Sequence, residues 1–389
     1  MELRVSGIVY NSFYGDLGGG ELRMLEHLRL TRLPREEISV VLHESGPFRG
    51  CIESLGINTD QISWWPASRR PVRLVNERVV AWRLRRHFRR RQAGLVFCNT
   101  YNDLTMAGRV AKSLGIPVIW RSHADLFPFL EKYPPNRREE MVALVDSTAT
   151  RILTTTEYDR ALILNSGFAS DKVHVVPLGV DLLAFKEAPS RRSRLRKEWR
   201  VPDHLPLIGF VSRMVPQKGH TVFFAALTDV LKRHPDVRVL VVGDANADGS
   251  DPDGFRMALR AYVNKLGLSH CVQFLGFQDD VPGIMSAIDI FVHASLKEPF
   301  GSVIVEAMAA GRPVIASRTL GPQEIIIDGS TGLLTPPGES LALATAMLRL
   351  LEAPGFAQTL GIKGRKHVEK LYDLSQTIEL LDNHFMAMM

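Results

Sequence analysis

The chain has 389 residues, of which 45% are apolar and 23% charged, and its formal net charge is +6; a chain this long exceeds one ordinary core, so we expect two globular domains. No run of about 18 apolar residues predicts a membrane span, and the start of the chain lacks the features of a signal peptide. Three scattered cysteines support neither a disulfide framework nor a zinc site, so we expect a reduced, cytoplasmic protein.

Short strand-like runs alternate with helix-length segments along the first half of the chain, a pattern that predicts a parallel sheet with crossover helices. The expected strands are residues 4–10, 37–43, 61–65, 94–99, 117–123, 151–156 and 172–179.

Gly18, Gly19 and Gly20 follow the first expected strand and open a helix. Glycines allow backbone N–H groups to approach an anion closely, and the helix N-terminus favours negative charge, so this turn could bind a phosphate. It matches neither the spaced glycines of dinucleotide folds nor the P-loop. A plain flexible loop is therefore an equal alternative.

A strongly basic segment follows, with Arg69 as its first residue and Arg91 as its last. These residues, 69–91, include ten arginines and one acid, whereas the remaining 38 basic residues of the chain are outnumbered by 41 acidic ones. The segment could meet an anionic lipid surface or an acidic acceptor, or it could simply be a solvated cationic face. Nucleic acid binding is less favoured, because no aromatic residues are interleaved as stacking platforms.

An apolar stripe runs through this basic segment at helical spacing, formed by Val75, Val79 and Trp82. The same spacing continues into Arg86 and Arg90. We therefore expect the stripe to face the core and the last turns of the helix to leave it.

The second half of the chain restarts the alternation after residues 181–206, a polar, basic and proline-bearing segment that marks a domain boundary. The expected strands are residues 206–213, 237–244, 272–277, 289–295 and 313–318. Helical segments fill residues 339–387. We expect an α/β protein of two doubly wound, Rossmann-like domains, residues 1–182 and 183–372, with a C-terminal helix, 373–389, packing back on the first domain. Ligands of such sheets collect where the strands end.

Arg213 and Lys218 lie on the loop after the first strand of the second domain, with no acid between them. Two cations at the carboxyl end of a strand suit a diphosphate whose charge grows as a bond breaks. The alternative is a solvated loop.

Glu298 and Glu306 belong to the stretch "EPFGSVIVEAMAAG". Glu306 is the one charge in a helix that is otherwise apolar on every side, and a buried carboxylate needs a partner. The amides of Phe300, Gly301 and Ser302 would face a phosphate at the helix start. Carboxylates accept pairs of hydroxyls, so we expect both acids to bind the diols of a ribose or a hexose.

Three alternatives to this interpretation stay open. Glu306 could form a structural ion pair with Arg213 or Arg312. The two acids could instead be the pair of a glycoside hydrolase, which would flank a scissile bond and need access for water. The acidic turn with Asp248, Asp251 and Asp253 could suggest a metal, but it lacks the downstream Glu of a calcium loop and is more typical of a surface turn.

These residues resemble the retaining glycosyltransferases of family 4, which have the GT-B fold of two facing Rossmann-like domains with a cleft between them. The resemblance covers nearly the whole chain and is densest from residue 206 to residue 338. The matching stretches are "GGGE", "VVPLGVD", "VSRMVPQKG", "VVGD", "VQFLGF", "EPFGSVIVEAMAAGRPVIAS" and "EIIIDGSTGLLTPPG". Ser212 stands where a glycine is more usual, and "TLGPQE" replaces a double-glycine turn.

The resemblance implies a role for each of these positions. Arg213 and Lys218 would hold the donor diphosphate, Glu298 the hydroxyls of the transferred sugar and Glu306 the ribose. His123 would lie beside the donor sugar. The remaining donor-binding residues would be Gly18, Gly19, Gly243, Phe277, Phe300, Gly301, Ser302 and Val303.

The activity implied is transfer of a hexose, with glucose from UDP-glucose as the first candidate, to an acceptor hydroxyl in polysaccharide or glycolipid biosynthesis, with retained configuration and without a metal. No side chain in these motifs is an obvious nucleophile, so a same-face substitution fits better than a covalent intermediate. A GDP-mannose-dependent mannosyltransferase, an epimerase or phosphorylase of the same fold, and a basic polyanion-binding protein remain as alternatives. The expected partners are the nucleotide sugar and a saccharide or lipid-linked saccharide.

Overall fold

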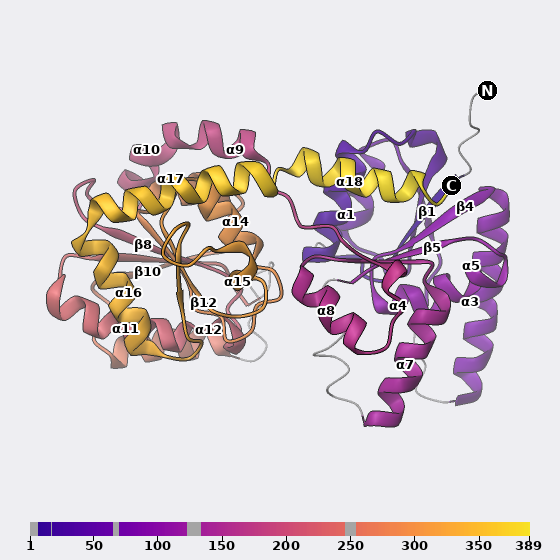
Figure 1. Ribbon diagram of the computed structural model, residues 1–389, viewed down its shortest axis with the longest axis horizontal. Helices are drawn as coiled ribbons and strands as arrows, with labels where there is room; N and C mark the ends of the chain where they lie inside the picture. Colours follow the sequence, from indigo (N-terminus) through magenta and orange to yellow (C-terminus); the bar gives the residue numbers. More distant parts are fainter. Residues whose placement is uncertain (1–6, 17, 65–69, 123–133, 246–253) are drawn as a thin grey trace. The chain divides into compact units, whose positions relative to one another are not determined.

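The computed structural model describes residues 7–16, 18–64, 70–122, 134–245 and 254–389, without the side chains of residues 70–74 (Figure 1). The chain divides into two compact units. Unit 1 comprises Met1–Leu178 and Ser375–Met389, and unit 2 comprises Gly179–Leu374. His123 and the acidic turn with Asp248, Asp251 and Asp253 lie outside the described residues.

Unit 1 is built on a parallel sheet of seven strands in the order β3-β2-β1-β4-β5-β6-β7. The strands are β1 (Gly7–Ser12), β2 (Ile38–Leu42), β3 (Asn58–Gln61), β4 (Ala93–Cys98), β5 (Val118–Arg121), β6 (Arg151–Thr154) and β7 (Val173–Val175). Every residue of β1, β2 and β5 is buried. Because helices cover a parallel sheet on both faces, apolar residues stand next to one another in these strands instead of alternating with polar ones.

The crossovers of unit 1 are helical. They are α1 (Gly19–Leu30), α2 (Pro47–Glu53), α3 (Arg70–Arg90), α4 (Tyr101–Asp103), α5 (Arg109–Ser113), α7 (Pro135–Thr148), α8 (Glu157–Asn165) and the closing α18 (Leu374–Met386). A π turn, Leu104–Gly108, joins α4 to α5, and 3₁₀ turns lie at Arg35–Glu37 and Ser170–Lys172. No helix in the part of the chain that the structure describes is long and apolar enough to cross a bilayer.

Unit 2 repeats this plan with a parallel sheet of six strands in the order β10-β9-β8-β11-β12-β13. The strands are β8 (Leu207–Val211), β9 (Arg238–Val242), β10 (Val272–Gly276), β11 (Ile290–His293), β12 (Val314–Ser317) and β13 (Leu333–Thr335). The strand order reverses between β8 and β11. Open α/β sheets bind their ligands at this reversal, outside the carboxyl ends of the strands.

Helices cover both faces of the second sheet as well (Figure 1). They are α9 (Leu182–Glu187), α10 (Arg192–Glu198), α11 (His220–Arg233), α12 (Phe255–Lys265), α13 (Val281–Ala287), α14 (Ser302–Ala309), α15 (Pro322–Ile325), α16 (Ser340–Glu352) and α17 (Pro354–Leu371), with 3₁₀ turns at Ala188–Arg191 and Pro216–Lys218. The expected fold class, two doubly wound parallel sheets, is confirmed.

Two strands differ from the expectation. The third strand was expected at residues 61–65 but forms at Asn58–Gln61, where all four residues are at least partly exposed and polar. Its position therefore follows from pairing with β2 rather than from apolar character. The short strand Leu333–Thr335 was not expected at all, since only three residues pair with β12.

The basic segment of residues 181–206, expected to mark the domain boundary, folds as α9, a 3₁₀ turn and α10. The Arg196 side chain is fully buried and donates hydrogen bonds to the carbonyls of Ala287, Pro202 and Leu205 at 3.0, 2.7 and 2.6 Å. Asp289 lies 3.3 Å from the same guanidinium. Arg196 therefore satisfies buried carbonyl and carboxylate oxygens within unit 2.

The helix α18 lies alongside α1 in unit 1 (Figure 1) and is held there by the Asp382 carboxylate. This side chain is 3% exposed and accepts hydrogen bonds from His27 Nε2 at 2.8 Å, Thr31 Oγ1 at 2.6 Å and the Arg32 backbone N–H at 2.9 Å. Burial alone would raise the pKa of Asp382, but these hydrogen bonds lower it. Phe385 adds an apolar contact to Tyr10, with the ring centroids 5.5 Å apart.

We expect Asp382→Ala to loosen α18, because three donors would lose a buried acceptor. The loss should lower the free energy of unfolding of unit 1 by about 2–4 kcal/mol. Hydrogen exchange of the α1 and α18 amides, together with urea unfolding, would measure it. The matched control is Glu379→Ala, which removes an exposed partner of Arg32 on the same helix and should cost less than about 1 kcal/mol. Equal effects of the two changes would contradict the anchoring role.

Candidate functional site

The loops after β8 and β11 are in direct backbone contact at the carboxyl edge of the second sheet. Gly219 has a φ of +72° and ends the β8 loop, and a Cβ at this position would collide with the Ala294 carbonyl oxygen. The Leu296 N–H donates to the Gln217 carbonyl at 2.8 Å. Only glycine allows this approach without strain, so the backbone itself brings Lys218 next to the segment that contains Glu298.

Glu298 lies at the centre of a buried polar cluster formed by these two loops. Its Oε2 atom lies 2.6 Å from Lys218 Nζ, 3.0 Å from His293 Nε2 and 3.4 Å from Ser295 Oγ. All three contacts end on Oε2, and within the described ranges no side chain or backbone group donates to Oε1. One carboxylate oxygen is therefore satisfied by the protein, while the other can accept hydroxyl groups.

The electrostatics of the cluster keep Glu298 ionised. Burial alone would raise its pKa, but the hydrogen bond from His293 and the charges of His293 and Lys218 outweigh burial and lower the pKa to about 2. His220, at the start of α11, has its pKa lowered to about 3 by burial and by the nearby charges of Lys218 and His293. The site thus contains a permanent carboxylate, which accepts hydrogen bonds but cannot serve as a general acid near neutral pH.

The N-terminus of α14 adjoins this carboxylate. Gly301 precedes the helix with a φ of +94°, and the position of a Cβ there would lie 3.3 Å from Glu298 Cγ. The first turns of α14 therefore direct their N–H groups and the positive end of the helix dipole to the region beside Glu298. Phe300 is buried and packs edge-on against Tyr372, which fixes the backbone before the helix.

Glu306 differs from the expectation in one respect. The sequence suggested a helix buried on every side, whereas Ser302, Val303 and Glu306 share a partly exposed face of α14. Ile304, Val305 and Ala307 are buried. The Glu306 carboxylate therefore lies on a partly open side of the helix rather than in the core.

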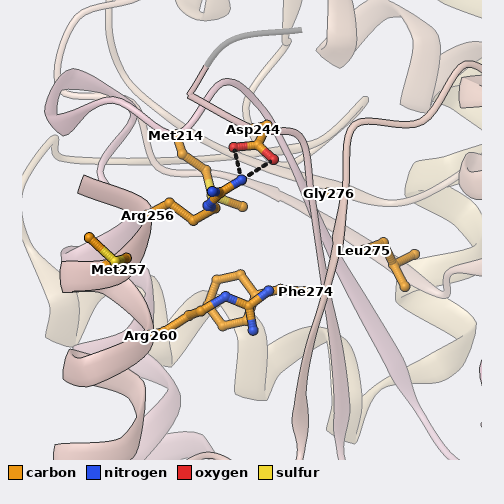
Figure 2. A pocket seen from close by; sticks show the side chains of 8 residues that line it. All are labelled: Met214, Asp244, Arg256, Met257, Arg260, Phe274, Leu275 and Gly276. Carbon is orange, nitrogen blue, oxygen red and sulfur yellow. Dashed lines mark hydrogen bonds and ion pairs between the residues drawn. The ribbon is translucent and has the colours of Figure 1, made fainter. Parts of the chain in front are cut away.

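A pocket of about 490 Å³ opens at the ends of β9 and β10 (Figure 2). Arg256 Nη1 contacts both oxygens of Asp244, at 2.8 and 3.0 Å, and the Arg260 guanidinium lies 4.6 Å from the centre of the Phe274 ring. The lining residues are Met214, Asp244, Arg256, Met257, Arg260, Phe274, Leu275 and Gly276. An aromatic ring, two guanidinium groups and an acid around a cavity of this size can accommodate a flat, polar ligand.

The structure places the other predicted residues as follows. Gly243 donates its N–H to the Gly276 carbonyl at 2.8 Å, which ties the ends of β9 and β10 together beside this pocket. Phe277 follows β10 and is 52% exposed. Arg213 is exposed, and no side chain of the described residues forms a hydrogen bond with its guanidinium. Gly18 and Gly19 begin α1 in unit 1, and their role toward a diphosphate stays a prediction.

Sequence reasoning missed two groups of residues. His293 and Ser295 lie at the end of the expected strand at residues 289–295 and contact Glu298. The position of His293 at the carboxyl end of a strand is the signal that could have identified it. Asp244 and Arg256 were missed because their pairing joins a strand end to a helix twelve residues later. Among the residues that the structure describes, no group of three or more His, Cys, Asp or Glu side chains is placed to hold a metal ion.

Two family models match the chain. One, described as "Glycosyl transferase 4-like domain", matches residues 18–179, and the other, described as "Glycosyl transferases group 1", matches residues 191–367. The first range lies within unit 1 except for its last residue, Gly179, and the second lies within unit 2.

Similar curated proteins are glycosyltransferases. The D-inositol 3-phosphate glycosyltransferase of Corynebacterium jeikeium (strain K411) is 31% identical over 243 residues, which are 61% of this chain and 57% of that protein. The 2-deoxystreptamine glucosyltransferase of Streptomyces kanamyceticus is 29% identical over 257 residues, 65% of this chain and 62% of that protein. The matched part of the chain thus spans about three fifths of the length of these relatives.

Solved structures match nearly the whole length of the chain. Anabaena HepE in complex with UDP-glucose has a TM-score of 0.84 at 26% identity, covering 98% of this chain and 100% of HepE. The sucrose-phosphate synthase of Thermosynechococcus elongatus has a TM-score of 0.79 at 22% identity, with 98% of each chain covered, and shares the fold. The chain therefore belongs to the group 1 glycosyltransferases of family 4, a retaining family, and has the GT-B fold.

The depressed pKa of Glu298 predicts a pH dependence of stability. Its folded pKa, about 2, lies below its ordinary value of 4.5, so the stabilisation is complete above pH 4.5 and is lost as the pH falls through 2. It should amount to about 3 kcal/mol. In urea unfolding, Glu298→Gln should be less stable at pH 7 by about this amount and show a weaker decline between pH 5 and pH 3. Glu369→Gln, at an exposed pair with Arg365, is the control, and the idea fails if both variants behave alike.

Proposed function

We propose that the chain transfers a hexose from a UDP-sugar, with UDP-glucose as the first candidate, to an acceptor hydroxyl in polysaccharide or glycolipid biosynthesis. One observation carries the proposal. The Glu298 carboxylate has one oxygen bound to Lys218, His293 and Ser295 and the other available, beside the N-terminus of α14. A sugar diphosphate has hydroxyls for the free oxygen and phosphates for the cation and the helix start.

Each part of the donor then has a counterpart in unit 2. Lys218 has three N–H donors, so it can bind a phosphate oxygen while keeping its contact with Glu298. Arg213 is exposed on the same loop and would share the diphosphate. Glu306, on the open face of α14, would accept the ribose hydroxyls. The pocket of Figure 2 would take the base, with Gly243 and Phe277 at its edge.

In the proposed reaction, Lys218, Arg213 and the N-terminus of α14 stabilise the leaving diphosphate. When the bond between the sugar and the diphosphate breaks, negative charge grows on the phosphate oxygens, and the fixed cations and helix dipole lower the energy of that state. We propose that this replaces a metal ion. Because Glu298 stays ionised, its role is to orient the sugar rather than to donate a proton. The acceptor hydroxyl attacks on the face that the leaving group occupied, the bond from the sugar to the diphosphate breaks, and the proton of the hydroxyl passes to the departing diphosphate oxygen.

The names of the similar proteins support this proposal and its alternatives. HepE is described in complex with UDP-glucose, which supports that donor. The acceptors named for the curated relatives, D-inositol 3-phosphate and 2-deoxystreptamine, are ring compounds rich in hydroxyl or amino groups. A GDP-mannose-dependent transferase is the second candidate. Both transferases consume the donor only when an acceptor hydroxyl is present, and this requirement distinguishes them from an epimerase or a phosphorylase.

A thermal-shift panel of UDP-glucose, UDP-galactose and GDP-mannose, with a chelator present, tests the donor. A ligand at one hundred times its Kd stabilises the protein by about 2.7 kcal/mol, so the preferred donor should raise Tm clearly. Stabilisation by GDP-mannose alone would favour the second candidate. A response that requires added divalent metal would count against metal-free stabilisation of the diphosphate.

Replacing Lys218 tests its assigned role in the reaction. Lys218→Met should lower kcat/KM for sugar transfer by about 100- to 1,000-fold, because a cation facing the leaving diphosphate is lost. The control is Lys232→Met at an exposed pair with Asp229 in the last turn of α11, which should keep near-normal activity. Initial rates of nucleotide release with a hydroxylated acceptor measure both. An unchanged kcat/KM in Lys218→Met would remove this residue from the mechanism.

A further inference from the structure

The helix α3 turns its apolar stripe away from the core of unit 1, contrary to the expectation from the sequence. Among the described apolar side chains of α3, Val80, Leu84 and Phe88 enter the core, each 1% exposed or less. Val75, Val79 and Trp82 are 63%, 42% and 58% exposed. At 3.6 residues per turn these three residues form a line on the opposite side of the helix. We call this line the α3 ridge.

Arginines border the α3 ridge on both sides. Helical geometry puts Arg78, Arg85 and Arg89 along one border and Arg83 and Arg90 along the other, and all five are exposed. Arg86 continues the ridge itself, with its guanidinium 5.8 Å from the Trp82 ring. Apolar side chains therefore project outward between two rows of positive charge.

These arginines differ from the other basic run of the chain. In α10 and the turn before it, Arg191, Arg192 and Arg196 pair with Asp280 or Asp289. For the six exposed arginines of α3, no ion pair with a described acidic side chain exists. The nearest polar contact is from Arg85 Nη2 to Ser113 Oγ, at 3.5 Å. Their charge is thus not neutralised within the described part of unit 1, and it projects into the solvent.

A groove of about 600 Å³ between α3 and the segment of the π turn and α5 extends this surface. Arg78, Arg85 and Arg109 contribute cations to its lining, with Glu77 as the one acid, and Ala81, Met106 and Val110 contribute apolar surface. A phosphate group with an attached hydrocarbon chain meets both kinds of partner here.

We propose that the α3 ridge and its bordering arginines dock unit 1 onto the surface of an anionic phospholipid bilayer. The arginines attract the negatively charged headgroups, and Val75, Val79 and Trp82 enter the boundary between headgroups and acyl chains. A soluble polyanion would satisfy the arginines but would leave the exposed apolar line in water. The bilayer is therefore the partner that matches both features. The inference does not depend on which sugar donor the chain uses.

Vesicle binding of the full chain tests this inference. The purified protein is mixed with phosphatidylcholine vesicles and with vesicles that also contain phosphatidylglycerol, and the bound fraction is measured by flotation at low and at physiological salt. We expect binding to the anionic vesicles only, weakening with salt because the attraction is electrostatic. Recovery of the protein in the soluble fraction with both vesicle types would overturn the proposal.

Two sets of variants separate the ridge from its charges. Val79→Ser combined with Trp82→Ser keeps every arginine and should weaken binding about tenfold or more, because the inserted apolar surface is lost. Arg86→Gln combined with Arg90→Gln should weaken it about 25-fold, on the basis of about 1 kcal/mol for each arginine near an anionic surface. The matched control is Arg194→Gln combined with Lys197→Gln on α10, which removes the same charge from exposed residues in unit 2 and should bind as the wild type does.

Trp82 also supplies a direct readout of insertion. Lipids with a bromine or nitroxide quencher near the headgroup should quench part of the tryptophan fluorescence of the wild type. That loss of fluorescence should be absent in Trp82→Phe. Circular dichroism confirms that each variant is folded. If heparin competes fully with vesicles and the serine variant binds both as tightly as the wild type, the surface is a polyanion site and the membrane proposal is wrong.

Discussion

The buried carboxylate of Glu298 is the constraint on which the arrangement of the site in unit 2 depends. An unpaired charge in this position would cost at least several kcal/mol, so the fold has to bring a cation and hydrogen-bond donors to it. Lys218 and His293 come from two different strand ends, and they reach Glu298 only because the loops after β8 and β11 touch at Gly219. The backbone contact, the ion pair and the position of the α14 N-terminus are therefore parts of one arrangement, and a ligand meets a charge pattern that exists before it binds.

Much of the fold follows from the sequence because parallel sheets covered on both faces require continuous apolar strands. The runs that became β1, β2, β8 and β9 show this plainly, and glycines and charged residues follow them where the chain leaves the sheet. The same topology explains why Lys218 and Glu298 could be assigned to one site although 80 positions separate them. The carboxyl ends of β8 and β11 lie side by side in the sheet, so residues after these strands must meet.

The remaining features depend on tertiary packing that periodicity does not encode. The spacing of Val75, Val79 and Trp82 identifies one side of a helix, but it does not say whether that side faces the sheet. Val80, Leu84 and Phe88 form an equally good stripe, and they are the side that packs on the sheet. β3 and β13 are short and take their positions from the neighbouring strand. Glu306 was interpreted from the apolar residues around it, whereas its own side of α14 is partly open.

The two basic runs illustrate the same point for charge. Both contain several arginines close together in the sequence, and composition alone gives them equal weight. In α10, Arg192 and Arg196 pair with Asp289, whereas Arg194 is exposed. Arg196 is fully buried among carbonyl oxygens, so its charge holds α10 against α13 and is not available to a partner. In α3 the buried face is already filled by apolar residues, which leaves the arginines no inward position. Where a helix has its apolar residues on two opposite sides, one side builds the core, and the other side, with the charges beside it, is left for something outside the chain.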